Sequence, residues 1–257
     1  MSRIRLDVAM VERGLCASRS EAVSLIESGT VRVAGVIADK AARLVSRAED
    51  IVVVQPKRFV SRGGEKLLRA LEHFNIDVSG RSVLDAGSST GGFTDCVLQR
   101  GAQRVAAFDV GKAQIHERLR NDERVSVHEG VNIRHLGTGD LPFPCSLAVV
   151  DVSFISLEKI LPALVDVLTS EAEQSVPEMV LLVKPQFEAG REEVSRGRGI
   201  ITDTATHDRV VAHIAGCAES LGCKVMGTIE SPIKGADGNT EFLMYVTCQP
   251  TGAGVSI

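Results

Sequence analysis

The chain has 257 residues and a formal net charge of −4, and 44% of its residues are hydrophobic and 24% charged. This composition allows a sizeable core and excludes the collagen-like, disordered and disulfide-scaffold classes. Only 4% of the residues are aromatic, with no Trp, which disfavours nucleic-acid binding through aromatic stacking platforms.

The net charge hides an asymmetry along the chain. Residues 1–70 hold 13 Lys/Arg and 8 Asp/Glu, a balance of +5, whereas residues 71–257 hold 16 Lys/Arg and 25 Asp/Glu, a balance of −9. A basic segment can indicate a polyanionic partner, but it can equally be ordinary solvated surface. Charge alone leaves both interpretations open.

The cysteines and apolar runs indicate the compartment. The six cysteines have no CxxC spacing and no neighbouring pair of histidines, so the sequence predicts no metal site. We expect them to be buried reduced thiols, as in a cytoplasmic protein. The N-terminal residues lack the apolar region of a signal peptide, and no apolar run approaches the roughly 20 residues that span a bilayer. We therefore expect a cytoplasmic protein with no membrane partner.

Residues 1–56 are predicted to form a small α/β domain. Ser18 is the expected N-cap of a helix over 18–28, with Glu21 at the capping-box position. Residues 30–33 and 51–54 alternate or run apolar in the manner of strands. The next residues, 57–63, contain Pro-flanked cations and lead into two glycines, which predicts an interdomain linker.

Helix and strand patterns alternate over the remaining domain, residues 64–257. Expected strands are 82–86, 104–108, 125–128, 147–150, 179–183, 225–229 and 242–246, and expected helices are 65–74, 91–100, 112–120, 155–168 and 204–221. This alternation predicts a doubly wound, Rossmann-like α/β fold with a mostly parallel sheet. The last two strands should pair antiparallel, because no helix separates them. Residues 191–199, which include three arginines, are expected to be a loop that either closes over substrate or is simply mobile.

A glycine loop follows the first of these strands. Residues 85–93 read DxGxxxGG followed by Phe93. A phosphate-binding P-loop would have Lys where Phe93 stands, and a dinucleotide fingerprint would have Gly where Ser89 stands. The remaining pattern is typical of S-adenosylmethionine-dependent methyltransferases. Asp109 ends the next strand, where a carboxylate can accept hydrogen bonds from ribose hydroxyls.

Two further charged residues are expected at the same edge of the sheet. Asp151 follows the strand over 147–150, and the next residues are Val and Ser rather than the Pro-Pro of amino-group methyltransferases, which disfavours base N-methylation. Cys145 lies at the opposite end of that strand, which disfavours methylation of a pyrimidine carbon. Lys184 ends the strand over 179–183, where burial is costly unless the ammonium is paired or functional.

These motifs give the chain a resemblance, over nearly its whole length, to TlyA-type, FtsJ-like ribosomal RNA 2′-O-methyltransferases. Residues 5–35 resemble the small RNA-binding module of a ribosomal small-subunit protein. Residues 60–67 resemble the stretch that introduces the methyltransferase domain of the family, and residues 85–95 and 184–188 resemble its most specific motifs.

The resemblance implies an S-adenosyl-L-methionine cofactor, no metal, and ribosomal RNA in ribosomal subunits as the partner. It implies methyl transfer to a ribose 2′-hydroxyl, with cytidine as the expected nucleotide. The catalytic set maps onto Lys66, Asp151, Lys184 and Glu241, with Lys184 orienting or deprotonating the hydroxyl. The expected cofactor-binding residues are Asp85, Gly87, Ser88, Ser89, Thr90, Gly91, Gly92, Phe93, Asp109, Val110, Asn132 and Asp151. The expected RNA contacts are Arg3, Arg5, Arg19, Arg32, Lys57, Arg58 and Arg62.

Three other functions remain open at this point. The protein could methylate an rRNA base, or it could be a noncatalytic RNA-binding assembly factor with a vestigial cofactor pocket. A hemolysin is a poorer fit, because the sequence shows neither a signal peptide nor a membrane segment. The sequence does not distinguish a monomer from a weak dimer.

Overall fold

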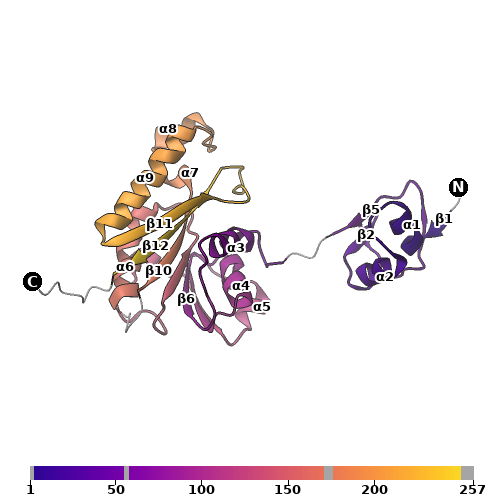
Figure 1. Cartoon of the computed structure of the whole chain (residues 1–257), viewed down its shortest axis with the longest axis horizontal. Helices are drawn as coiled ribbons and strands as arrows, with labels where there is room; N and C mark the ends of the chain where they lie inside the picture. Colours follow the sequence, from indigo (N-terminus) through magenta and orange to yellow (C-terminus); the bar gives the residue numbers. More distant parts are fainter. Residues whose placement is uncertain (1–2, 55–57, 171–175, 250–257) are drawn as a thin grey trace, which may run out of the picture. The chain divides into compact units, whose positions relative to one another are not determined.

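The computed structural model describes residues 3–54, 58–170 and 176–249, and it divides the chain into two compact units, Met1–Arg58 and Phe59–Ile257 (Figure 1). The division falls within the stretch 57–63 that the sequence assigns to a linker. The residues after it belong to the second unit: Phe59 is 4% exposed in one of its hydrophobic clusters, and the Val60 N–H donates to Asp95 Oδ2 at 2.8 Å. The second unit therefore begins at Phe59.

The first unit packs two helices on two small antiparallel sheets. The helices are α1 (Leu6–Glu12) and α2 (Arg19–Glu27), and the strands are β1 (Arg3–Arg5), β2 (Val31–Val33), β3 (Val36–Ile37), β4 (Leu44–Ser46) and β5 (Ile51–Val53). β1 pairs with β4, and β2 lies between β3 and β5. Ser18 Oγ accepts the Glu21 N–H at 3.2 Å, which confirms the predicted N-cap. The Glu21 carboxylate reaches the Ala17 N–H instead of the Ser18 N–H, so the capping box is incomplete.

The second unit is built on one seven-stranded sheet with the order β11-β12-β10-β9-β6-β7-β8. The strands are β6 (Ser82–Ala86), β7 (Arg104–Asp109), β8 (Val125–Glu129), β9 (Leu147–Val150), β10 (Glu178–Val183), β11 (Cys223–Glu230) and β12 (Phe242–Cys248). β12 is antiparallel to both of its neighbours, and every other neighbouring pair is parallel. The sheet confirms the predicted doubly wound fold and its antiparallel final pair.

Helices cover both faces of this sheet. They are α3 (Gly63–His73), α4 (Gly92–Gln99), α5 (Glu117–Arg120), η1 (Ile133–His135), η2 (Leu157–Lys159), α6 (Leu161–Ser170), α7 (Pro185–Glu188), α8 (Arg191–Arg196) and α9 (Thr204–Ser220). Strand residues alternate between two hydrophobic clusters: Leu84 and Leu181 pack in one, and Val83 and Val180 in the other. Because successive side chains point to opposite faces, each buried strand supplies both clusters at once.

Three helix and loop predictions are wrong. The helix expected over 112–120 is only α5, because Ala113 has φ 54° and His116 begins the helix as its N-cap. The helix expected over 155–168 is divided into η2 and α6, with Pro162 in the first turn of α6, where the missing N–H costs no helical hydrogen bond. The loop expected over 191–199 contains α8, which follows Gly190.

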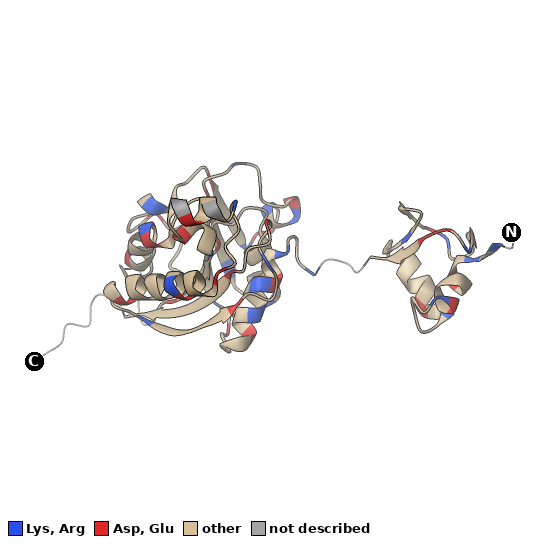
Figure 2. Ribbon diagram, turned by 90° about the horizontal axis from the view of Figure 1, so that it is seen from above, with Lys and Arg blue, Asp and Glu red and all other residues tan. Residues whose placement is uncertain are grey.

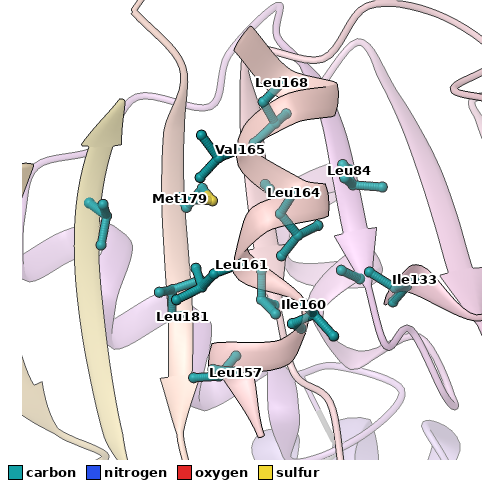
Figure 3. Packing of buried hydrophobic residues seen from close by; sticks show 14 of the residues in the cluster. Leu84, Ile133, Leu157, Ile160, Leu161, Leu164, Val165, Leu168, Met179 and Leu181 are labelled. Carbon is teal, nitrogen blue, oxygen red and sulfur yellow. The ribbon is translucent and has the colours of Figure 1, made fainter. Parts of the chain in front are cut away.

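The core under α6 is densely apolar. Leu161, Leu164 and Leu168 recur at helical spacing and are fully buried, and Figure 3 shows Leu161 beside Leu181 of β10 and Val165 beside Met179. This contact holds the segment after β9 against β10. Asp151 directly follows β9, and Lys184 directly follows β10.

The cysteine prediction is wrong for one pair. Cys223 and Cys248 form a disulfide, whereas Cys16, Cys96, Cys145 and Cys217 take part in no disulfide within the described residues. Cys223 and Cys248 are direct cross-strand partners in the β11–β12 register, so their side chains lie on the same face at disulfide distance.

Leu161→Ala is expected to lower the free energy of unfolding of the second unit by about 2–5 kcal/mol, because it removes apolar contacts and leaves a cavity in a core with little room to collapse. Chemical denaturation followed by circular dichroism measures the change. Met226→Ala, at a position that is 47% exposed, is the matched control and should change stability by less than about 1 kcal/mol. Equal losses in the two variants would contradict the packing argument.

Candidate active site

Two adjoining cavities lie at the carboxyl ends of the parallel strands. The first has a volume of about 430 Å³ and the second about 310 Å³, and both are lined by Gly87, Ser89, Asp151, Ser153 and Phe154. β6 lies between β7 and β9, so the strand order reverses at this point of the sheet. Ligands of open α/β sheets bind at such a reversal, because the loops on its two sides diverge.

The glycine loop fits tightly between β6 and the end of β9. Gly87 has φ +90°, and a Cβ atom there would lie 2.5 Å from the carbonyl oxygen of Asp151. Gly91 has φ +93° and is the N-cap of α4. Only glycine combines this backbone conformation with so close an approach at position 87. The loop therefore runs directly against the residue that ends β9.

Asp85 lies beneath this loop and is fully buried. Thr94 Oγ1 donates to its Oδ2 at 2.5 Å, whereas its Oδ1 is buried with no hydrogen-bond partner in the described part of the chain. Burial raises the pKa of Asp85 to about 7, the Thr94 hydrogen bond opposes the shift, and the Asp151 and Asp109 carboxylates add to it. The carboxyl group is therefore close to its titration midpoint at neutral pH.

Asp109 organises the second cavity. Its Oδ2 accepts the Ser89 N–H at 2.8 Å and its Oδ1 accepts the Gly111 N–H at 2.6 Å, so one carboxylate ties the glycine loop to the loop after β7. Val110, which is 71% exposed, and Asn132 line the same cavity.

The residues expected to bind the cofactor line the first cavity, the second cavity or both, and two of them lie behind the glycine loop. The second cavity holds Asp109, Val110 and Asn132, and the first holds Ser88, Thr90, Gly92 and Phe93, while Gly87, Ser89 and Asp151 line both. Asp85 and Gly91 line neither cavity and act on the shape and charge of the loop from behind it.

The chemistry of these residues fits a cationic nucleoside such as S-adenosylmethionine. Three carboxylates, Asp85, Asp109 and Asp151, interact electrostatically around the loop, which favours a positively charged ligand. The unpaired Asp85 Oδ1 is a buried acceptor next to the loop, and Asp109 is placed to accept from ribose hydroxyls. The Gly87 cradle leaves no side chain between the backbone and a ligand.

The four residues of the predicted catalytic set line the first cavity as two ion pairs. Lys184 Nζ lies 2.6 Å from Asp151 Oδ1 and donates to Ser153 Oγ at 2.9 Å. Lys66, on the first turn of α3, pairs with Glu241, which precedes β12. Lys66, Lys184 and Glu241 are all less than 10% exposed. The arrangement offers two fixed ammonium groups at the rim of one cavity.

The sequence analysis did not find several residues of this site. Ser153 is the second partner of Lys184, and Ser61, Gln186 and Asp237 also line the first cavity. Phe154 lines both cavities, has φ 65° and is 92% exposed. A large apolar side chain three residues after Asp151 was the available signal for Phe154, and no pattern in the sequence distinguishes the other residues.

The predicted RNA-binding arginines differ in their surroundings. Arg3 and Arg32 are exposed on strands of the first unit, and Arg62 lines the first cavity of the second. Arg5 and Arg19 both bind the buried Asp7, at 3.0 and 2.8 Å, and these guanidinium groups, Arg5 foremost, hold the pKa of Asp7 well below its usual range. Arg58 is exposed, and Lys57 lies outside the described residues.

A third, more open cavity of about 800 Å³ adjoins the site. It shares Phe154, Gln186 and Phe187 with the first cavity and adds three cations, Arg134, Lys159 and Arg198. This cavity is therefore suited to an anionic chain that continues away from the two ion pairs.

Comparisons with known proteins define the class. Residues 59–247 match the FtsJ-like methyltransferase family, and residues 4–52 match the S4 domain. The FtsJ-like match lies within the second compact unit, and the S4 match lies within the first. The site described above lies in the FtsJ-like region.

Relatives that match nearly the whole chain narrow the class to one family. The chain is 44% identical to the 16S/23S rRNA (cytidine-2′-O)-methyltransferase TlyA of Mycobacterium tuberculosis, over 96% of this chain and 91% of that one. A solved structure from Streptococcus thermophilus that carries a hemolysin name matches with a TM-score of 0.72 and 39% identity, over 97% of this chain and 90% of that one. The chain belongs to the TlyA family of FtsJ-like methyltransferases.

One member of the family is named Hemolysin A, from Brachyspira hyodysenteriae, and is 40% identical over 94% of this chain and 99% of that one. Within residues 3–54, 58–170 and 176–249, no helix has the length and apolar character needed to cross a membrane.

Asp85→Asn is expected to change how stability depends on pH. The pKa of Asp85 is about 7 in the folded state, above the value of about 3.9 in an unfolded chain, so the folded state binds the proton more tightly. The free energy of unfolding of the wild type should therefore carry a penalty that grows as the pH rises from about 4 to about 7 and then stays constant.

The asparagine variant lacks this titration, so its stability relative to the wild type should increase between pH 5 and pH 8, by on the order of 2 kcal/mol or more. Urea unfolding at the two pH values measures it. Asp166→Asn, at an exposed position on α6, is the control and should leave the wild-type pH dependence in place. A wild-type profile that Asp85→Asn leaves unchanged would contradict the raised pKa.

Proposed function

We propose that this protein transfers a methyl group from S-adenosyl-L-methionine to the 2′-hydroxyl of a cytidine ribose in ribosomal RNA. The observation that carries the proposal is the first cavity, which joins the glycine loop to the Lys184–Asp151 and Lys66–Glu241 pairs. The substrate follows the name of the relative from Mycobacterium tuberculosis, which is 44% identical over nearly the whole chain.

The cofactor would occupy the second cavity and the part of the first that the glycine loop borders. When bound, it supplies an electrophilic methyl group on a cationic sulfonium. Asp109 would accept from its ribose hydroxyls, and the Gly87–Asp151 contact would fix the loop against which it lies. Asp151 lines both cavities, so its carboxylate would stabilise positive charge on the cofactor side while it holds Lys184.

Lys184 is the residue proposed to act on the hydroxyl. Asp151 and Ser153 hold two of the three directions in which an ammonium can donate, which leaves one N–H for the 2′-oxygen. A group fixed in this way positions the oxygen for in-line attack on the methyl carbon at about 3–3.5 Å. Lys184 either orients the hydroxyl or, once neutral, accepts its proton as the new oxygen–carbon bond forms.

Lys66 and Glu241 are proposed to place the ribose. They join α3 to the segment before β12, and both line the first cavity. Removing either partner would leave the other charge buried and unpaired, which destabilises the cavity itself. These two residues therefore act on the position of the substrate more than on its proton.

The RNA chain would be bound by positive charge rather than by stacking platforms. Arg134, Lys159 and Arg198 line the third cavity next to the site and are suited to phosphate groups. Figure 2 shows basic and acidic positions interspersed along the ribbon of both units. The exposed Arg3 and Arg32 of the S4 unit would add phosphate contacts, and substrates of this kind would place the protein with ribosomal subunits in the cytoplasm.

Lys184→Ala is expected to lower the rate of methyl transfer to undermodified ribosomal subunits by about 10²–10⁴-fold, because the group that orients or deprotonates the hydroxyl is lost. Binding of S-adenosylmethionine, measured by calorimetry, should be retained. Lys224→Ala, an exposed lysine on β11, is the matched control.

Mass mapping of the product distinguishes the remaining alternatives. A methyl group on a cytidine ribose is the expected result, and a methyl group on a base would contradict the proposed acceptor. Full activity of Lys184→Ala would contradict the proposed role of Lys184. A wild-type protein that binds RNA but not S-adenosylmethionine would instead indicate a noncatalytic assembly factor.

Deleting residues 1–58 is expected to abolish rRNA modification while leaving cofactor binding measurable, because the S4 unit supplies phosphate contacts and the second unit contains both cavities. The truncation should stop before Phe59, which is buried in the second unit. A second truncation that also removes Phe59 and Val60 should unfold at a lower temperature. Undiminished rRNA modification by the 59–257 fragment would contradict the role of the S4 unit.

A further inference from the structure

A second group of potential ligands lies outside the three cavities. Glu158 of η2 and His213 and Cys217 of α9 bring their functional atoms within 4.8 Å of one another. Glu158 Oε2 lies 3.1 Å from His213 Nε2, and Cys217 Sγ lies 3.8 Å from the same nitrogen. None of the three lines the active-site cavities.

The spacing of these atoms is close to that of a coordination sphere. His213 and Cys217 are four residues apart on α9, so they share one face of the helix. In a tetrahedral zinc site with bonds of about 2.0–2.3 Å, neighbouring ligand atoms are separated by roughly 3.2–3.6 Å. The two measured separations, 3.1 and 3.8 Å, require only small side-chain rotations to reach these values.

Glu188, at the end of α7, supports the segment that carries Glu158. Its Oε1 accepts the Leu157 N–H at 2.9 Å, and its Oε2 is buried with no hydrogen-bond partner among the described residues. The Glu188 carboxylate also interacts electrostatically with His213 and Cys217, but it does not belong to the group of ligand atoms within 4.8 Å of one another. A histidine, a thiol and one carboxylate therefore converge from η2 and α9, and a second carboxylate, on α7, accepts from the backbone of η2.

The ligand types select the ion. Mg²⁺ and Ca²⁺ require oxygen ligands, whereas a mixture of sulfur, imidazole nitrogen and carboxylate oxygen is typical of Zn²⁺. We propose that Glu158, His213 and Cys217 bind a zinc-class divalent cation, with water as the fourth ligand. Glu158 and His213 are each at least half exposed, so the ion can enter directly from solvent.

Such an ion would connect α9 to η2, and the hydrogen bond between Leu157 and Glu188 joins η2 to α7. η2 follows Asp151 and Ser153 by a few residues, and α7 begins directly after Lys184. The ion would therefore restrain the segment that follows Asp151 and Ser153, two residues that line the first cavity. The alternative is a Glu158–His213 ion pair without a metal, in which Cys217 is a neighbouring thiol with no role in binding.

Cobalt titration of the untagged, full-length protein separates these two cases, because a thiolate bound to Co²⁺ gives a charge-transfer absorption that oxygen and nitrogen ligands do not. We expect one Co²⁺ per chain with this absorption, displaced by Zn²⁺ but not by Mg²⁺. Cys217→Ser should abolish the absorption and weaken Zn²⁺ affinity by at least about 100-fold, since loss of a mere supporting residue already costs 10–100-fold. His213→Gln should weaken it similarly.

Cys16→Ser is the matched control, because Cys16 is also a free, partly exposed thiol but lies in the first unit. It should leave Co²⁺ binding unchanged, and all variants should keep the circular dichroism spectrum of the metal-free wild type. Absence of the charge-transfer band, or its persistence in Cys217→Ser, would overturn the proposal, as would Zn²⁺ binding that His213→Gln leaves intact. None of these outcomes depends on methyltransferase activity.

Discussion

The site depends on one electrostatic constraint, namely that two ammonium groups are buried at the edge of an apolar sheet. Lys66 and Lys184 are each less than 10% exposed, and an unpaired buried charge costs several kcal/mol. Each lysine therefore needs a carboxylate at contact distance. Asp151 meets this need only if β9 and β10 are neighbours, and Glu241 meets it only if β12 enters the sheet antiparallel beside β10. The strand order and the charge pairs support the same geometry.

Much of this architecture follows from short-range patterns. The strands of the second unit were predictable because buried parallel strands are short apolar runs that end at a charged or glycine residue, as in Ala86–Gly87 and Val150–Asp151. The rule that parallel strands present their carboxyl ends together then placed Asp151 and Lys184 at one edge. The same reasoning failed over 112–120, where φ +54° at Ala113, rather than hydrophobic periodicity, decides where α5 begins.

Pairing across long sequence distances was not predictable in this way. Lys66 and Glu241 are 175 residues apart, and Glu158 and His213 are 55 apart, so their contacts depend on how helices pack on the finished sheet. The Cys223–Cys248 disulfide likewise depends on the exact register of β11 and β12, which shifts once along its length. One extra residue on either side of that shift would place the two sulfur atoms on opposite faces. Spacing rules for CxxC or paired histidines do not detect ligands that only tertiary packing brings together.

The charge asymmetry of the chain has a structural part as well as a functional one. Asp7 is 1% exposed and takes its counter-charges from Arg5 and Arg19, so Arg19 joins α2 to α1 and Arg5 fixes the start of α1. Their guanidinium groups are still 46% and 60% exposed, and a guanidinium has five donors, of which Asp7 uses only some. An arginine fixed in this way loses little conformational entropy when it meets a phosphate, unlike a freely rotating lysine. If Arg5 and Arg19 bind RNA as the sequence predicts, the buried carboxylate would hold both guanidinium groups in place for phosphate, although it adds negative charge to the segment.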